Sequence, residues 1–324
     1  MKKILSLLFL VVLFQSCDDG DLTVERIDFS DVTTSSCGET LYKLNGNEAL
    51  YLKIPASFNA FRNEVTPADQ PRTIPIGSSV SVTYRAYNGS PSAGNICNTP
   101  GPISPVATTE WTATAGNIEI RTTAVYTTNE ATGATRISRY SHAISFKNII
   151  FSKPEGTQIY DTFNFGEFST TPTSLPFNFS PDDLKLCTTN NVLYNARING
   201  IEGLSIQNFN EALLSTSNLG VPKRGLITGS SNTLTYRLFT TALTTSDNSN
   251  YFCPSTFPDF PPTSEIWVAQ NGIENVSGII EVTTTTNGTG YLHSILLKGV
   301  TFQKGNDTFY FGDAILLGNL LTTD

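Results

Sequence analysis

Apolar and polar residues alternate in many short stretches of the chain, which is the period of a β-strand with one buried face. The stretch 80–87, VSVTYRAY, places its two valines, its first tyrosine and its alanine on one side. In the stretch DTFNFGE, Phe163 and Phe165 likewise share one side. Such stretches are separated by turn residues and proline-rich segments, and no helical pattern is convincing beyond the N-terminal apolar run. We therefore predict an all-β fold built of antiparallel β-sandwiches.

The pattern occurs twice along the chain. Residues 140–151, YSHAISFKNIIF, return as residues 291–302, YLHSILLKGVTF, and residues 161–167, DTFNFGE, return as residues 307–313, DTFYFGD. A repeat this long indicates a duplicated domain, since solenoid repeats run only about 20–50 residues. The predicted organisation is a signal peptide at 1–16, an acidic tether at 17–25, a first sandwich at 26–168, a linker at 169–183 and a second sandwich at 184–324.

The two copies differ most in one hairpin and in their proline-rich loops. After the matched stretches GNIEIRTT and GIIEVTTT, the first copy has 11 more residues between its glutamate and its histidine, in the segment 124–138. The proline-rich loops, 88–109 and 241–264, are about 20 residues long, a length that is uncommon and often functional. Surface specificity is more plausible where the copies differ than where they agree.

Four cysteines follow the N-terminal segment, and the duplication suggests how they pair. Each copy holds two, separated by similar intervals, so we predict the disulfides Cys37–Cys97 and Cys187–Cys253. Closing loops of this length stabilises each domain by about 4 kcal/mol on the chain-entropy estimate. The alternative, a zinc site, lacks a CxxC pair or histidines at ligand spacing, so we expect no metal and no cofactor.

Charge and composition narrow the classes of partner. The chain has 20 basic and 28 acidic residues, a formal net charge of −8, and loses Lys2 and Lys3 with the signal peptide. The chain lacks the excess of basic residues that would neutralise phosphates, so nucleic acid is not an expected partner.

No catalytic residue is predicted. His142 and His293 lie at even spacing with apolar neighbours, so both should be hydrogen-bonded core or edge residues. Glycoside hydrolysis would need two carboxylates about 5–10 Å apart, but Glu119 and Glu281 alternate with apolar residues and should face solvent. We therefore expect a protein that is not an enzyme.

Two further glutamates share the parity of apolar neighbours and should be buried. Because buried carboxylates need partners, we hypothesise structural ion pairs between Glu48 and Arg85 in the first copy. In the second copy the corresponding pair is Glu202 and Arg237.

The aromatic residues divide into a shared set and a differing set. Trp111 and Trp267 occupy equivalent positions, so they should belong to the common fold. The second proline-rich loop has aromatics that the first lacks, which form a candidate contact patch or else cover their own domain: Tyr251, Phe252, Phe257 and Phe260.

The N-terminus reads as a secretory signal that ends at a cysteine. Two lysines and an apolar run precede LFQSC, which resembles a lipobox with Cys17 as the lipidated residue. Directly after it stand Asp18, Asp19 and Asp21, which resemble the acidic export signal of surface lipoproteins of the Bacteroidota. The resemblance implies a lipid anchor in the outer membrane with the protein body facing the cell exterior.

Three hypotheses about function follow. The first is a non-catalytic structural or accessory subunit of an outer-membrane assembly, with an outer-membrane β-barrel protein as partner. The second is a surface protein that binds a glycan or a host ligand, as adhesins do. The third is a cryptic hydrolase, which would require carboxylates converging in a cleft.

Overall fold

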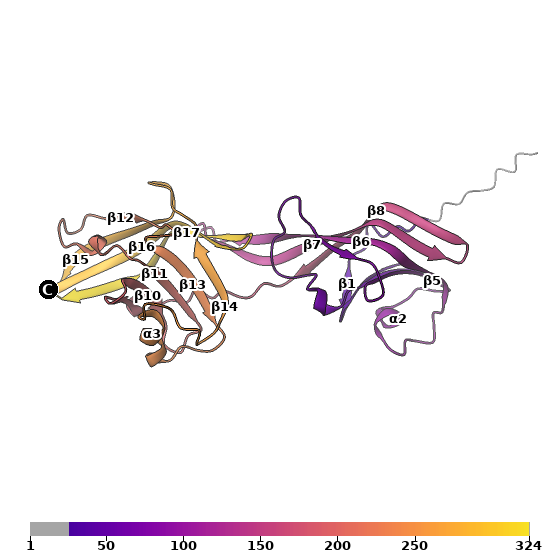
Figure 1. Ribbon diagram of the computed structural model, residues 1–324, viewed down its shortest axis with the longest axis horizontal. Helices are drawn as coiled ribbons and strands as arrows, with labels where there is room; N and C mark the ends of the chain where they lie inside the picture. The colour runs from indigo at the N-terminus through magenta and orange to yellow at the C-terminus, as the bar shows by residue number, and fades with distance from the viewer. Residues whose placement is uncertain (1–25, 324) are drawn as a thin grey trace, which may run out of the picture.

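The computed structural model describes residues 26–323, and it shows two β-domains arranged end to end in an elongated molecule (Figure 1). The predicted all-β, sandwich-like fold is confirmed. The lipidation site Cys17 and the acidic residues Asp18, Asp19 and Asp21 lie outside the described residues. Within those residues no helix combines the length and the apolar character that crossing a bilayer requires.

The first domain is one antiparallel sheet in the order β1-β2-β3-β5-β6-β7-β8, with β4 paired to β6. Its elements are β1 (Ser35–Cys37), β2 (Thr40–Asn45), β3 (Glu48–Lys53), η1 (Ala56–Phe58), β4 (Arg72–Pro75), β5 (Ser81–Tyr87), α2 (Ala93–Cys97), β6 (Ala107–Thr128), β7 (Thr135–Lys153) and β8 (Gly156–Thr170).

The second domain repeats this arrangement in the order β12-β15-β16-β14-β13-β11-β10-β9, with β17 paired to β16. Its elements are η2 (Pro181–Asp183), β9 (Leu184–Cys187), β10 (Val192–Ala196), β11 (Glu202–Gln207), η3 (Glu211–Leu214), β12 (Lys223–Leu226), β13 (Thr233–Phe239), α3 (Thr245–Phe252), β14 (Thr263–Ala269), β15 (Ile279–Asn287), β16 (Gly290–Lys304) and β17 (Asp307–Thr323).

The long strand β6 corresponds to two strands of the second copy, β14 and β15. Its first part pairs with β5 and its later part with β4, and the register shifts near Gly116, between the two parts. Gly116 has a φ of +123°, and a Cβ there would stand 2.8 Å from the Cα of Ile149, so the bend requires glycine. In the second copy the segment 270–278 separates the two strands.

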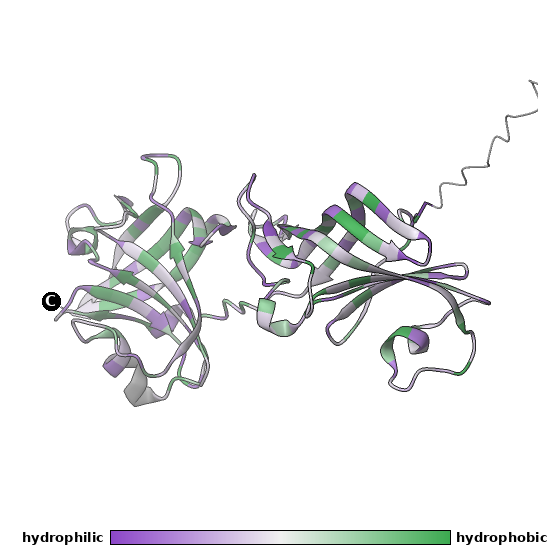
Figure 2. Cartoon of the chain, turned by 45° about the vertical axis from the view of Figure 1, so that its right-hand side comes forward, coloured by the Kyte–Doolittle hydropathy of each residue, from purple (hydrophilic) through white to green (hydrophobic). Residues whose placement is uncertain are grey.

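Each bent sheet encloses its own apolar core. In Figure 2 apolar and polar positions alternate along the strands of both domains. The first core includes the fully buried Trp111, Phe146 and Phe165, and the second includes the buried Trp267 and Phe302. The tryptophans therefore belong to the shared fold, as predicted.

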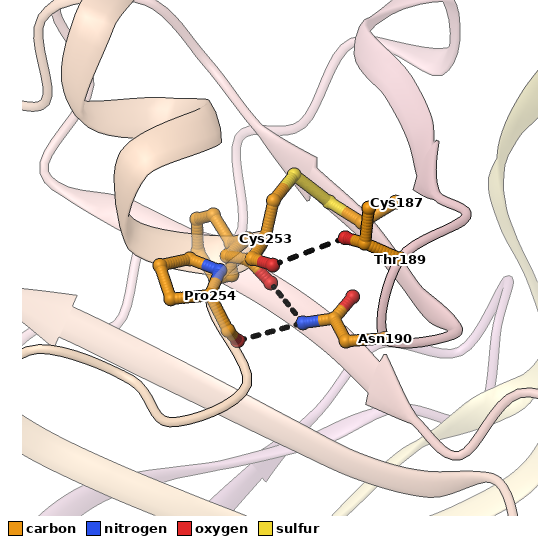
Figure 3. The surroundings of a disulfide bond; sticks show 6 residues. Cys187, Thr189, Asn190, Cys253 and Pro254 are labelled. Carbon is orange, nitrogen blue, oxygen red and sulfur yellow. Dashed lines mark hydrogen bonds between the residues drawn. A yellow bond between two sulfur atoms is a disulfide. The ribbon is translucent and has the colours of Figure 1, made fainter.

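Both predicted disulfides form, each within one domain. Cys37 bonds to Cys97, the last residue of α2, and Cys187 bonds to Cys253 just after α3. Around the second bond, the Asn190 side-chain amide donates to the carbonyls of Phe252 and Pro254 at 3.1 and 2.8 Å (Figure 3). The disulfide and this amide together hold the proline-rich loop against the sheet.

Candidate functional site at the domain junction

The β6–β7 hairpin of the first domain extends onto the second domain (Figure 1). The backbone N–H of Asp313 donates to the carbonyl of Thr132 at 2.8 Å. The backbone N–H of Tyr310 donates to the hydroxyl of Thr135, also at 2.8 Å. The 11 extra residues of the first copy therefore build an interdomain contact.

The β16–β17 hairpin of the second domain reaches back onto the first. The Asn306 side-chain amide donates to the carbonyl of Val65 at 3.1 Å, and the N–H of Val65 donates to Oδ1 of Asp307 at 2.9 Å. Asp307 is fully buried here, whereas its counterpart Asp161 is exposed at the free end of the first domain. Two reciprocal hairpins thus lock the domains together.

The linker between the domains is bound to the second domain by one carboxylate. Glu202 of β11 accepts the N–H groups of Phe177 and Asn178 at 2.8 and 2.6 Å and the hydroxyl of Tyr236 at 2.9 Å. Phe177 adopts a left-handed conformation with φ of 47°, and its ring centroid lies 4.3 Å from that of Tyr236. The linker therefore contributes to the core of the second domain rather than acting only as a spacer.

Between the two hairpins and the linker lies a cavity of about 320 Å³. The first domain contributes the β7 residues Arg136 and Tyr140, and the second contributes Glu265, Trp267 and Lys304. The linker closes one side with segment 171–175. Cavities of about 300–1,000 Å³ hold most small ligands, so this is the candidate site.

Glu265 is the centre of a polar cluster in the cavity wall. Its carboxylate forms an ion pair with Lys304 and accepts the indole N–H of Trp267 at 3.1 Å. The Lys304 ammonium also lies 5.6 Å from the centroid of the Trp267 ring. The negative charge of Glu265 is therefore already balanced by a neighbouring cation.

Arg136 is a half-buried cation whose contacts are aromatic. Its guanidinium lies over the rings of Phe177, Phe309 and Phe311, at 4.5, 5.2 and 5.4 Å from their centroids. Its Nη1 donates to the carbonyls of Thr135 and Tyr310. Burial lowers the pKa of Arg136, and among residues 26–323 it belongs to no ion pair.

Tyr140 and Asp307 meet next to this cavity. Burial and the adjacent Asp307 carboxylate raise the pKa of Tyr140. Burial also raises the pKa of Asp307, although the Val65 N–H and the Tyr140 hydroxyl oppose that shift. The counterparts of these two residues in the other copy, Tyr291 and Asp161, are both more exposed, so this pairing belongs to the junction alone.

The predicted role of the histidines is confirmed. His142 is fully buried and hydrogen-bonded at 2.8 Å on each side, from Nδ1 to Thr122 and from Nε2 to Thr170. His293 makes the same two contacts with threonines of its own domain, at 2.9 and 3.0 Å. Burial lowers the pKa of His142 to about 4 and also lowers that of His293.

The predicted ion pairs Glu48–Arg85 and Glu202–Arg237 are wrong. In the sheet register Arg85 stands opposite Ala49 and Arg237 opposite Gly203, so each arginine faces away from its glutamate. A tyrosine hydroxyl replaces the arginine in both copies, since Tyr84 donates to Glu48 as Tyr236 does to Glu202. Arg85 instead pairs with Glu110, and Arg237 donates to Ser205 and lies over Phe257.

Most of the candidate contact patch is also corrected. Tyr251 and Phe252 are buried and Phe257 is partly buried, because all three pack onto the sheet face next to the disulfide. Only Phe260 is largely exposed, at 70%. Three of these aromatics therefore cover their own domain, and no patch of four forms.

Of the two carboxylates expected at the solvent face, one is covered. Glu119 is partly exposed, but Glu281 is buried because Arg224 of β12 and Lys298 of β16 close over it. Within the described part of the chain, no group of three or more His, Cys, Asp or Glu residues is placed to hold a metal ion.

Sequence reasoning did not identify Arg136, Tyr140 or Asp307 as site residues. The available signal was the longer hairpin of the first copy, which contains Arg136. Comparison of the chain with known protein families, curated proteins and solved structures finds no match.

Proposed function

We propose that the protein is a non-catalytic, lipid-anchored surface lipoprotein that acts as a structural or accessory subunit of an outer-membrane assembly. Its partner would be an outer-membrane β-barrel protein or complex. The anchor rests on the lipobox-like sequence ending at Cys17 and the aspartates that follow it.

The observation that carries the proposal is the place where the N-terminal segment joins the first domain, compared with the place of the junction. The N–H of Ile27 donates to the hydroxyl of Tyr160 on β8 at 3.2 Å, near the β7–β8 end of the first domain. The junction is at the opposite end of that domain (Figure 1). A rigid junction would therefore hold the second domain at a constant distance from the anchor, as a structural arm requires.

Three of the four residues considered for catalysis have structural partners, which supports the same proposal. His142 and His293 each bridge two threonines, and Glu281 binds two cations.

The test is recovery of partners from native outer membranes in mild detergent, using the tagged protein and mass spectrometry. We expect a stoichiometric β-barrel protein with the wild type and its loss with Cys17→Ala, which lacks the anchor. Recovery of the wild type alone, without any membrane partner, would refute the subunit role.

Binding of a glycan or host ligand is the second candidate function. The cavity at the junction favours it, because its volume and its aromatic, charged and hydroxyl-bearing lining suit a small polar ligand.

A further inference from the structure

The residues that line the junction cavity have one more cation than anions, and Asp307 lies outside this lining, beside Tyr140. Of its charged wall residues, Glu265 and Lys304 neutralise each other, which leaves Arg136 without a carboxylate among the described residues. This is unusual in a chain with a formal net charge of −8, which offers many acidic side chains. A second cavity, of about 500 Å³, adjoins the same arginine from the hairpin side.

Burying a cation without an anion carries a desolvation penalty. Three aromatic rings around Arg136 offset part of it through cation–π contacts. Nη1 is engaged by two carbonyls, but a guanidinium has five N–H donors in a planar fork. Such a fork matches the two oxygens of a carboxylate.

The rest of the lining indicates the body of the ligand. On the linker side, Thr171, Thr173 and Ser174 are exposed and bring hydroxyl groups to the cavity. Tyr140 and Trp267 also line the cavity and bring aromatic rings to it. A lining that has both hydroxyl groups and aromatic rings suits a ligand that has both hydroxyls and apolar C–H faces, which is the character of a sugar ring.

We infer that the junction cavity binds a carboxylate-bearing sugar residue of an acidic glycan, with Arg136 holding its carboxylate. The inference rests on the second candidate function and is independent of the subunit role. Both domains and the linker supply the site, so it exists only while the junction is assembled.

The test is titration calorimetry of the full-length protein in detergent, with D-glucuronate and D-galacturonate as probes. D-glucose has the ring without the carboxylate, and N-acetylalanine has a carboxylate without the sugar. We expect a uronate to bind and glucose to bind at least about tenfold more weakly, or about 1.4 kcal/mol. Arg136→Gln should weaken uronate binding by a similar factor or more, whereas Arg139→Gln, on the exposed part of the same strand, should not.

A second variant tests the site without changing Arg136, in case Arg136→Gln impairs folding. Ser174→Phe fills the cavity from the exposed linker and should also abolish uronate binding, with the melting temperature unchanged. Absence of uronate binding to the wild type, or uronate binding that survives both Arg136→Gln and Ser174→Phe, would overturn the inference. Equal binding of N-acetylalanine and uronate would overturn the assignment of a sugar. None of these results changes what the partner pull-down is expected to recover. The subunit role and the sugar site can therefore be refuted independently.

Discussion

Replacing Glu202 by glutamine should weaken the second domain much more than the equivalent change weakens the first. Glu202 accepts two backbone N–H groups of the linker and one tyrosine hydroxyl. Its counterpart Glu48 accepts the hydroxyl of Tyr84 and, among residues 26–323, no backbone N–H group of a linker. Glu48→Gln is therefore a matched control at the same position of the duplicated fold.

The magnitude follows from the hydrogen bonds. A hydrogen bond to a charged group contributes about 1.5–3 kcal/mol, and a buried donor left unpaired costs about 1–3 kcal/mol. Glutamine keeps one acceptor oxygen but turns an NH₂ group toward one of the linker N–H donors. We expect Glu202→Gln to reduce the free energy of unfolding of the second domain by about 3 kcal/mol and Glu48→Gln to reduce that of the first by about 1 kcal/mol.

Each domain contains one tryptophan, so the two domains can be followed separately. With Trp111→Phe, Trp267 alone reports urea unfolding of the second domain, and with Trp267→Phe, Trp111 reports the first. Freed from Glu202, the linker should also release Phe177 from its left-handed conformation and its contact with Tyr236. Equal losses of stability in the two variants would refute the reasoning that the linker contacts make Glu202 the stronger site.

Three further predictions concern the junction, the histidines and the disulfides. Replacing residues 125–138 by Asn-Gly-Thr gives the first hairpin the length of the second. The change should remove about 4 kcal/mol of interdomain contact and split one calorimetric transition into two. Glu130→Ala, at the exposed tip of the hairpin, should leave a single transition. His142 has its pKa lowered to about 4 by burial, so the unfolded state binds the proton first as pH falls from about 6.5. The free energy of unfolding should therefore drop toward pH 4 by up to about 1.4 kcal/mol per pH unit relative to His142→Gln, measured by urea titration at each pH. Serine replacement of both cysteines of either disulfide should cost its domain about 4 kcal/mol in the same titration, and a change below about 1 kcal/mol would contradict the pairing's stabilising role.

The features that sequence predicted correctly are those present in both copies. The alternation of apolar and polar residues predicted the strands, and the similar spacing of the two cysteines in each copy predicted the disulfides. The histidines were correctly placed because alternation alone decides which face of a strand is buried. The ion pairs Glu48–Arg85 and Glu202–Arg237 failed because the same rule, applied to the arginines, places Arg85 and Arg237 on the face opposite to the glutamates.

The junction could not be derived from alternation, because it depends on how one copy docks onto the other. Asp307 and Asp161 occupy equivalent positions, yet one is buried against Val65 and the other is exposed. Only the tertiary arrangement distinguishes them. The longer hairpin indicated this region, but nothing in its sequence showed that Arg136 would lie among one ring of the linker and two rings of the second domain.

The difference in hairpin length also makes the two equivalent hairpins unlike as docking surfaces. The junction joins the β6–β7 end of the first domain to the β16–β17 end of the second, so it is a contact between unlike surfaces. Contacts of this kind continue into open filaments unless something terminates them. The free ends of the molecule are the equivalents of these surfaces, the β7–β8 hairpin of the first domain and the β15–β16 hairpin of the second (Figure 1). The β15–β16 hairpin lacks the 11 residues that carry the contacts of Thr132, Thr135 and Arg136, so it does not present the surface with which the first domain holds the second.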